Sequence, residues 1–282
     1  MNITKFEDAN EYYQRVESYL LQDEATNCLL LGLSKALSNS QKDSDNSPYL
    51  VTVEDRGKIA ATAIQTPPRK LILGKTTNIE AIKAIARSLI AHNKSLPGVI
   101  APKSEAKTFV DAWQSLTGQY YELDVAMKIH QLETVQSINK SSGNFRLAKE
   151  SDCALLTNWI EAFESEALGD SEPRSDSQRW FERNLKNKSL VVWQDKAPVS
   201  MAAFGGATPH GIRINGVYTP PKYRGKGYAT SCIATLSQQL LNKGYKYCFL
   251  FTNLANPTSN YIYRKIGYRP ISEISNYGFG GN

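Results

Sequence analysis

The apolar positions in the second half of the chain predict a regular succession of strands and helices. Residues 245–251 are almost all apolar or aromatic, which is typical of a strand buried on both faces. Between residues 228 and 243 the apolar positions recur at helical spacing, and Gly244 then ends the predicted helix. The full prediction is strands at 144–148, 189–195, 198–206, 211–219, 245–251 and 268–279, with helices at 150–168, 175–187, 228–243 and 256–267.

The first half of the chain repeats much of this order. Both halves end with strand, helix, strand, helix and strand, which indicates a degenerate structural repeat. A polar stretch rich in Ser, Asn and Lys separates them. We therefore predict two α/β (α+β) domains at 1–135 and 144–282, joined by a linker at 136–143. The elements expected in the first half are a long helical region at about 6–36, strands at 48–55, 58–66 and 70–74, helix 78–92, strand 97–102, helix 104–118 and strand 120–132.

Length and composition agree with two globular domains. The chain has 282 residues, of which 41% are apolar and 21% charged. No apolar run approaches the roughly 20 residues that a membrane-spanning helix needs, and the polar N-terminus does not look like a secretory signal. We therefore expect a cytoplasmic protein without a membrane partner. The mild net charge of +6 fits a small anionic ligand better than a nucleic acid.

The cysteines and histidines are too scattered to predict a metal site. There is no C-x-x-C pair, and the three histidines lie far apart in the sequence. We expect buried free thiols in a reducing compartment and no metal cofactor.

Residues 217–230, VYTPPKYRGKGYAT, place two glycines and three cations between a predicted strand and a predicted helix. Such a turn leaves main-chain N–H groups free at the positive end of the helix dipole, which makes an anion site. Gly225 and Gly227 would let a phosphate approach the backbone, and Arg224 and Lys226 would add positive charge. The alternative is a solvent-exposed turn whose glycines only satisfy backbone geometry.

Two common phosphate-binding motifs do not fit this turn. A P-loop requires G-x-x-x-x-G-K-[ST], but Gly227 follows Lys226 directly. The dinucleotide fingerprint G-x-G-x-x-G would need a third glycine where Thr230 stands. It would also need an acidic residue at the end of strand 245–251 to hold a ribose, and none is present.

The segment RGKGYA (224–229) instead resembles the acetyl-CoA signature [RQ]-x-x-G-x-[GA] of the GNAT family of N-acetyltransferases. A second segment, NPTSNYIYRKIGY (256–268), is similar to the family pattern N-x-x-[AS]-x-x-x-Y-x-x-x-G-[FY]. The resemblance covers residues 143–279 and extends to the first half only as topology. It implies two GNAT-like domains, each with a mixed, mostly antiparallel central sheet flanked by helices. It also implies acetyl-CoA as co-substrate and a primary amine as acceptor.

The resemblance assigns a role to each matching residue. Two adjacent parallel strands of the second domain would splay apart, and main-chain groups at Val217 and Thr219 would pair with the pantetheine arm of acetyl-CoA. The pyrophosphate would lie on the N–H groups of residues 225–230. Lys226 could equally be a surface cation, and Asn256 could cap its helix as well as bind. The implied cofactor-binding residues are Val217, Tyr218, Thr219, Arg224, Gly225, Lys226, Gly227, Tyr228, Ala229, Thr230, Asn256 and Asn260.

Tyr263 matches the family position of a general acid that would protonate the departing CoA thiolate. A phenol with a pKa of about 10 is a donor and not a base at neutral pH. The alternative is that Tyr263 is a core aromatic residue, as we interpret Tyr261 and Tyr268 to be. The acceptor amine would attack the thioester carbonyl directly.

The sequence does not assign a general base. Many family members carry a glutamate on the strand before the turn, but residues 213–219 contain none. Glu161, Glu164 and Glu166 could face the acceptor or form a solvated helix face, and deprotonation through water is a third route. A non-catalytic acyl-CoA-binding sensor or adaptor is therefore the alternative function. The acceptor beyond a primary amine, and the choice between monomer and homodimer, stay open.

The first half lacks the cofactor signature. Its corresponding turn, LILGKTTNIEAI (71–82), keeps a single glycine, Gly74, and Trp113 falls near the position of Tyr263 with Gly118 after it. We interpret residues 1–135 as a degenerate domain without a CoA loop that supports the other domain or shapes its acceptor cleft. A separate binding domain with the same rhythm is the alternative.

Overall fold

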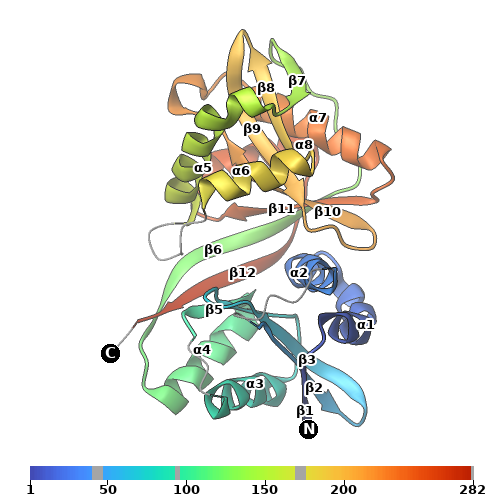
Figure 1. Ribbon diagram of the computed structural model, residues 1–282, viewed down its shortest axis with the longest axis vertical. Coiled ribbons are helices and arrows are strands. Elements are labelled where there is room, and N and C mark those ends of the chain that lie inside the picture. The colour runs from blue at the N-terminus through green and yellow to red at the C-terminus, as the bar shows by residue number, and fades with distance from the viewer. Residues whose placement is uncertain (40–46, 93–95, 169–175, 281–282) are drawn as a thin grey trace. The chain divides into compact units, whose positions relative to one another are not determined.

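The computed structural model describes residues 1–39, 47–92, 96–168 and 176–280 (Figure 1). Contacts divide the chain into two compact units. The first unit contains Met1–Ile129, Gly206–Thr208 and Ile271–Asn282, and the second contains His130–Gly205 and Pro209–Pro270. The domains predicted at 1–135 and 144–282 are defined by the repeated order of elements in the sequence, whereas the two units are defined by contacts in space. Those predicted boundaries therefore stay a prediction.

The two halves of the chain contain the same order of elements, so the predicted repeat is confirmed at this level. The first half contains β1 (Asn2–Phe6), α1 (Ala9–Leu20), α2 (Cys28–Ser38), β2 (Tyr49–Asp55), β3 (Lys58–Gln65), β4 (Leu71–Leu73), α3 (Ile79–Ala91), β5 (Gly98–Pro102), α4 (Lys103–Thr117) and β6 (Tyr121–Leu132). The second half contains β7 (Asn144–Leu147), α5 (Cys153–Leu168), α6 (Ser177–Lys186), β8 (Leu190–Asp195), β9 (Ala197–Gly205), β10 (Gly211–Tyr218), α7 (Tyr228–Asn242), β11 (Tyr247–Asn253), α8 (Pro257–Ile266) and β12 (Arg269–Phe279).

Strand pairing repeats as well. In the first half β1–β2, β2–β3 and β3–β4 are antiparallel and β4–β5 is parallel. In the second half β7–β8, β8–β9 and β9–β10 are antiparallel and β10–β11 is parallel. These mixed, mostly antiparallel sheets flanked by helices confirm the predicted fold class.

Helices cover both faces of the sheet in the first unit, as side-chain alternation along β2 and β3 requires. Leu50 and Ile64 pack in a core with residues of α1 and α2. The alternate residues Val51 and Ala63 pack in a second core with α3 and α4. In the second unit, α5 and α6 pack on β8, β9 and β10 around Trp159. None of the described helices combines the length and apolarity needed to cross a membrane.

The long helical region predicted at about 6–36 consists of two helices, α1 and α2, and it starts later than predicted. β1 occupies Asn2–Phe6, and a 3-10 turn at Leu21–Asp23 separates α1 from α2. Asn27 Nδ2 donates to the Leu20 carbonyl at 3.0 Å, and Asp23 Oδ1 accepts from Thr26 N at 3.2 Å. These side chains take main-chain partners that a continuous helix would use, so the helix stops there.

β12 belongs to the second half of the sequence, yet most of it lies in the first unit. It pairs antiparallel with β5, from Ile274 opposite Pro102 to Gly278 opposite Gly98 (Figure 1).

A buried charge cluster ties β12 to its neighbours in the first unit. Lys70 forms an ion pair with Asp124 of β6, and Lys70 Nζ also donates to Asn276 Oδ1 of β12 at 2.8 Å. The side chains of Lys70 and Asp124 are only 2% and 5% exposed. Because a buried charge without its partner is strongly destabilising, the cluster depends on all three residues.

Replacing Lys70 with Met should lower the free energy of unfolding by about 3 to 5 kcal/mol, since Asp124 would be left as an uncompensated buried charge. The double variant Lys70→Met/Asp124→Asn should lose less than the sum of the two single variants, because neither charge then lacks its partner. Urea unfolding followed by tryptophan fluorescence measures these losses. Strictly additive losses would show that the two side chains do not stabilise each other.

Candidate active site

The parallel strands β10 and β11 pair over only part of their length. Their ladder joins Gly211–Arg213 to Tyr247–Phe249, and no pairing follows it along these two fully described strands. β10 continues from Ile214 to Tyr218, and its other edge stays paired with β9. The edge of β10 that faces β11 therefore has main-chain groups without a strand partner beyond Arg213.

A β-bulge lies in this part of β10. Asn215 is opposite Ala203 of β9 and Tyr218 is opposite Met201, so β10 has one more residue than β9 in the interval. Gly216 has φ +58°, a left-handed conformation that favours glycine. The bulge thus changes the course of β10 where the ladder with β11 has ended.

The turn predicted to bind an anion connects β10 to α7. Gly225 and Gly227 have φ values of +77° and +76°, which glycine tolerates best. Gly227 is the N-cap of α7, and no described side chain caps this helix. Within the described part of the chain, no hydrogen-bond acceptor is found for the main-chain N–H groups of residues 225–230. These donors lie at the positive end of the α7 dipole and can hold an anion.

Arg224 links the turn to Glu166 of α5 and to Thr219, directly after β10. Its Nη2 contacts the two carboxylate oxygens of Glu166 at 2.7 and 3.0 Å, and its Nε donates to the Thr219 carbonyl at 2.8 Å. The guanidinium carbon lies 5.7 Å from the centre of the Tyr218 ring. Glu166 of α5 is thus the partner of Arg224, while Lys226 is exposed.

Tyr263 lies on α8 and is only 7% exposed. Its ring centre is 5.8 Å from that of Tyr268 and 6.4 Å from that of His130. Burial, and then the nearby Cys232 thiol, raise the pKa of Tyr263 above its ordinary value of 10. The phenol therefore keeps its proton at neutral pH. No hydrogen bond of its hydroxyl group is found among the described residues.

Tyr261 and Tyr268, the two tyrosines nearest to Tyr263 in the sequence, differ in burial. Tyr268 is buried, as predicted, and its hydroxyl lies 2.8 Å from Ser237 Oγ. The interpretation of Tyr261 as a packing residue is wrong, because Tyr261 is 67% exposed on the outer side of α8.

Asn256 and Asn260 hold the segment between β11 and α8. Asn256 Oδ1 accepts from Ser259 N at 3.0 Å and so caps α8. Asn260 Nδ2 donates to the carbonyls of Asn253 and Asn256, at 3.2 and 2.8 Å. Asn260 Oδ1 accepts from Thr252 Oγ1 at 2.8 Å. Both side-chain amides are thus bonded within the fold.

The corresponding turn of the first unit is occupied by its own side chains. Lys75 N donates to Asn27 Oδ1 at 2.9 Å, and Thr76 N donates to the buried carboxylate of Glu105 at 3.0 Å. Asn78 N donates to Thr76 Oγ1 at 3.0 Å, and Asn78 caps α3. Three main-chain donors of this turn, those of Lys75, Thr76 and Asn78, are therefore satisfied internally.

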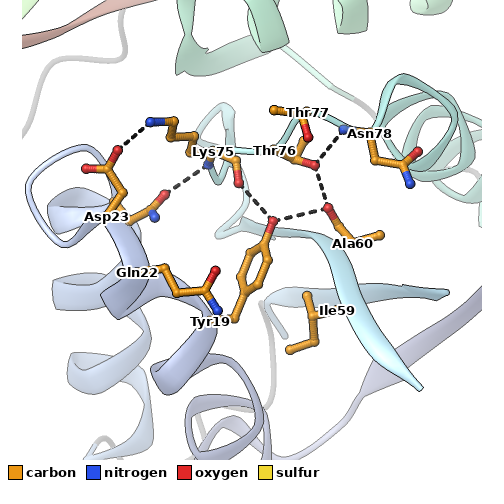
Figure 2. Close-up of a pocket in the computed structure, with 10 residues that line it drawn as sticks. Tyr19, Gln22, Asp23, Ile59, Ala60, Lys75, Thr76, Thr77 and Asn78 are labelled. Atoms are coloured by element: carbon orange, nitrogen blue, oxygen red, sulfur yellow. Dashed lines mark hydrogen bonds and ion pairs between the residues drawn. The ribbon is translucent and has the colours of Figure 1, made fainter. Parts of the chain in front are cut away.

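A polar pocket of about 460 Å³ lies beside this first turn (Figure 2). Lys75 Nζ pairs with Asp23 Oδ2 at 2.5 Å, and the Tyr19 hydroxyl lies 3.1 Å from the Ala60 carbonyl and 2.9 Å from the Lys75 carbonyl. Figure 2 shows these contacts as dashed lines between residues that line the pocket. β4 also ends at Leu73, so it offers no long strand edge like that of β10.

Part of the second half of the chain is similar in sequence to a known family of acyltransferases. Residues 154–268 match the sequence model of the Acetyltransferase (GNAT) family, and this segment is therefore a GNAT domain. Members of this family use acyl-CoA, so the match supports an acyl-CoA-dependent transferase. The chain matches no curated protein.

Solved structures with the same fold span the whole chain at low sequence identity. A GCN5-related N-acetyltransferase from Sphaerobacter thermophilus has a TM-score of 0.65 at 12% identity, covering 98% of this chain and 95% of that one. A tandem GNAT protein from the clavulanic acid biosynthesis pathway has a TM-score of 0.55 at 10% identity, covering 100% and 99%. A Drosophila protein has a TM-score of 0.70 at 10% identity, covering 99% and 98%. The first half therefore shares the GNAT fold as well.

Alanine substitutions at the two glycines of the turn should have unequal effects on stability. Each places a Cβ at positive φ, which costs about 1 to 2 kcal/mol. A Cβ on Gly225 would have nothing within 4 Å, whereas a Cβ on Gly227 would lie 2.8 Å from Ser141 Oγ. We expect Gly227→Ala to lower the melting temperature more than Gly225→Ala in scanning calorimetry. Equal shifts would contradict the close packing of Ser141 on Gly227.

Proposed function

We propose that this protein is an N-acetyltransferase that transfers the acetyl group of acetyl-CoA to a primary amine of a small molecule or peptide. The contrast between the two turns carries this proposal. The first unit satisfies three main-chain donors of its turn with Asn27, Glu105 and Thr76, whereas those of residues 225–230 have no acceptor in the described part of the chain. An anionic pyrophosphate is the group that such a turn favours.

The turn and β10 would share the binding of acetyl-CoA. The N–H groups from Gly225 to Thr230 would hold the pyrophosphate, with Tyr228 and Ala229 at the start of α7 and Lys226 adding charge. Main-chain groups of Val217 and Thr219 would pair with the pantetheine arm. At Thr219 the carbonyl already accepts from Arg224, so the N–H group is the one that we assign to the ligand. Asn256 and Asn260 would contribute by holding the start of α8.

The reaction needs a neutral amine and a proton donor. Acetyl-CoA supplies an acyl group activated as a thioester. The amine nitrogen forms a bond to the carbonyl carbon, the carbon–sulfur bond breaks, and Tyr263 gives its phenolic proton to the departing thiolate. Burial raises the pKa of Tyr263, so the phenol carries its proton before the reaction. The amine nitrogen loses its proton to solvent and the Tyr263 phenolate takes one back from solvent, which restores the enzyme without an assigned general base.

A non-catalytic acyl-CoA-binding protein is the second candidate. It is favoured by the lack of a carboxylate on β10, whose polar residues in this region are Arg213, Asn215 and Tyr218. Both candidates bind acyl-CoA, so only turnover separates them.

Isothermal titration calorimetry should detect one acetyl-CoA per chain. Gly227→Glu should weaken binding by at least about 100-fold, because it puts a carboxylate at the anion site and against Ser141. The matched control Thr77→Glu puts the same carboxylate on the turn of the first unit and should leave the dissociation constant unchanged. Absence of binding, or binding that Gly227→Glu leaves intact, would rule out both candidates.

Tyr263→Phe should lower kcat by about 100-fold or more with little effect on the affinity for acetyl-CoA, as expected for loss of a general acid. Thiol release measured against polyamines, amino acids, aminoglycosides and peptides first identifies the acceptor. Burial raises the pKa of Tyr263, so the phenol stays protonated up to at least pH 10. The wild-type kcat should therefore not fall through deprotonation of Tyr263 in this pH range. An unchanged kcat in the variant across this pH range would remove Tyr263 from the mechanism.

A further inference from the structure

The segment between β6 and β7, residues 134–143, lies outside the part of the chain that matches the GNAT family, 154–268. We call these residues the connector. All of them are described and all belong to the second unit. A polar, serine-rich sequence is typical of a linker. The structure instead packs the connector against both elements that carry the family motifs.

The first part of the connector contacts the end of α8, the helix that carries Tyr263. Gln136 N donates to the Ile266 carbonyl at 2.8 Å. Gly267, with φ +114°, ends the helix, and a Cβ there would lie 2.8 Å from the Thr134 carbonyl oxygen. This close approach means that the connector lies directly against the C-terminus of α8.

The last part of the connector holds the turn before α7. Ser141 N donates to Ser231 Oγ at 2.8 Å, and Ser141 Oγ donates to the Lys226 carbonyl at 2.7 Å. The carbonyl of Lys226 and the N–H of Gly227 belong to one planar trans peptide and point in opposite directions. By holding the Lys226 carbonyl, Ser141 directs the Gly227 N–H away from the connector.

A second set of hydrogen bonds fixes the connector itself. Ser142 Oγ and the Tyr228 hydroxyl both donate to Asp195 Oδ2, at 2.6 and 2.7 Å. Trp193 Nε1 donates to the Ser142 carbonyl at 2.8 Å. Asp195 at the end of β8 therefore joins the connector to the first residue of α7. Ser141 is thus held directly by its own bonds to Lys226 and Ser231, and its neighbour Ser142 is fixed by Asp195.

We propose that Ser141 is a positioning residue of the acyl-CoA site, which orients the Gly227 N–H group toward the pyrophosphate through the Lys226 carbonyl. This inference rests on the proposed function and deepens it, because it makes the connector part of the cofactor site. Ser141 would not touch the ligand. Its effect would be on affinity for acetyl-CoA and not on the chemical step.

Ser141→Ala should raise the dissociation constant for acetyl-CoA by about 3- to 10-fold in isothermal titration calorimetry, the range expected for one lost hydrogen bond. KM for acetyl-CoA should rise by the same factor while kcat changes by less than about 2-fold. Ser141→Thr keeps the hydroxyl group and should bind within about 2-fold of wild type. Ser115→Ala removes a similar bond, from Ser115 Oγ to the Asp111 carbonyl on α4, and should change nothing.

The outcomes separate this inference from the proposed function. If the wild-type protein does not bind acetyl-CoA, the proposed function is wrong and the inference fails with it. If the wild type binds and Ser141→Ala binds equally well, only the inference is overturned. A Ser141→Thr variant as weak as Ser141→Ala, with both melting temperatures unchanged, would also overturn it, because the hydroxyl would then not be the group that matters.

Discussion

Main-chain N–H groups at the start of a helix need hydrogen-bond acceptors, and the two turns of this protein meet that need in opposite ways. In the first unit the acceptors come from the chain itself. Glu105, 4% exposed, brings a carboxylate to Thr76 N, and Asn27 brings an amide oxygen to Lys75 N. In the second unit two glycines shape the turn and its donors face no described acceptor. We therefore assign the anion site to the second of the two similar halves.

The surrounding structure supports the open turn. β10 extends past its ladder with β11 and bulges at Gly216, which leaves a strand edge beside the turn. Arg224 forms an ion pair with Glu166 and donates to Thr219, so its charge orders the turn. The connector holds the opposite side through Ser141. Each contact limits the conformations of residues 224–228 before a ligand arrives, which lowers the entropy cost of binding.

The sequence predicted those features that depend on local pattern. The helical spacing in 228–243 and the glycines at 225 and 227 can be read from this one sequence without other information. They predict α7 and the turn before it correctly. The break between α1 and α2 depends on Asn27, whose amide bonds Leu20 and also Lys75, 48 residues away. The pairing of β12 with β5 depends equally on distant residues.

The residues of the candidate site likewise divide into those that a local sequence pattern reveals and those that depend on distant contacts. The motif residues 224–229 and Tyr263 could be found because their spacing is regular. Ser141 could not, because its contacts with Lys226 and Ser231 span 85 and 90 residues and its neighbours have the composition of a linker. The exposure of Tyr261 was missed because α8 contains two tyrosines two residues apart, and residue type alone does not show which of them is buried.

Hydrogen–deuterium exchange with and without acetyl-CoA tests most directly whether one turn binds and the other does not. Peptides that contain residues 225–230 should gain protection when the ligand is added, because their N–H groups acquire an acceptor. Peptides that contain residues 74–78 should exchange at the same rate in both conditions, since the N–H groups of Gly74, Lys75, Thr76 and Asn78 already have acceptors in the fold. Added protection at 74–78, or none at 225–230, would contradict the assignment of the acyl-CoA site to the second unit.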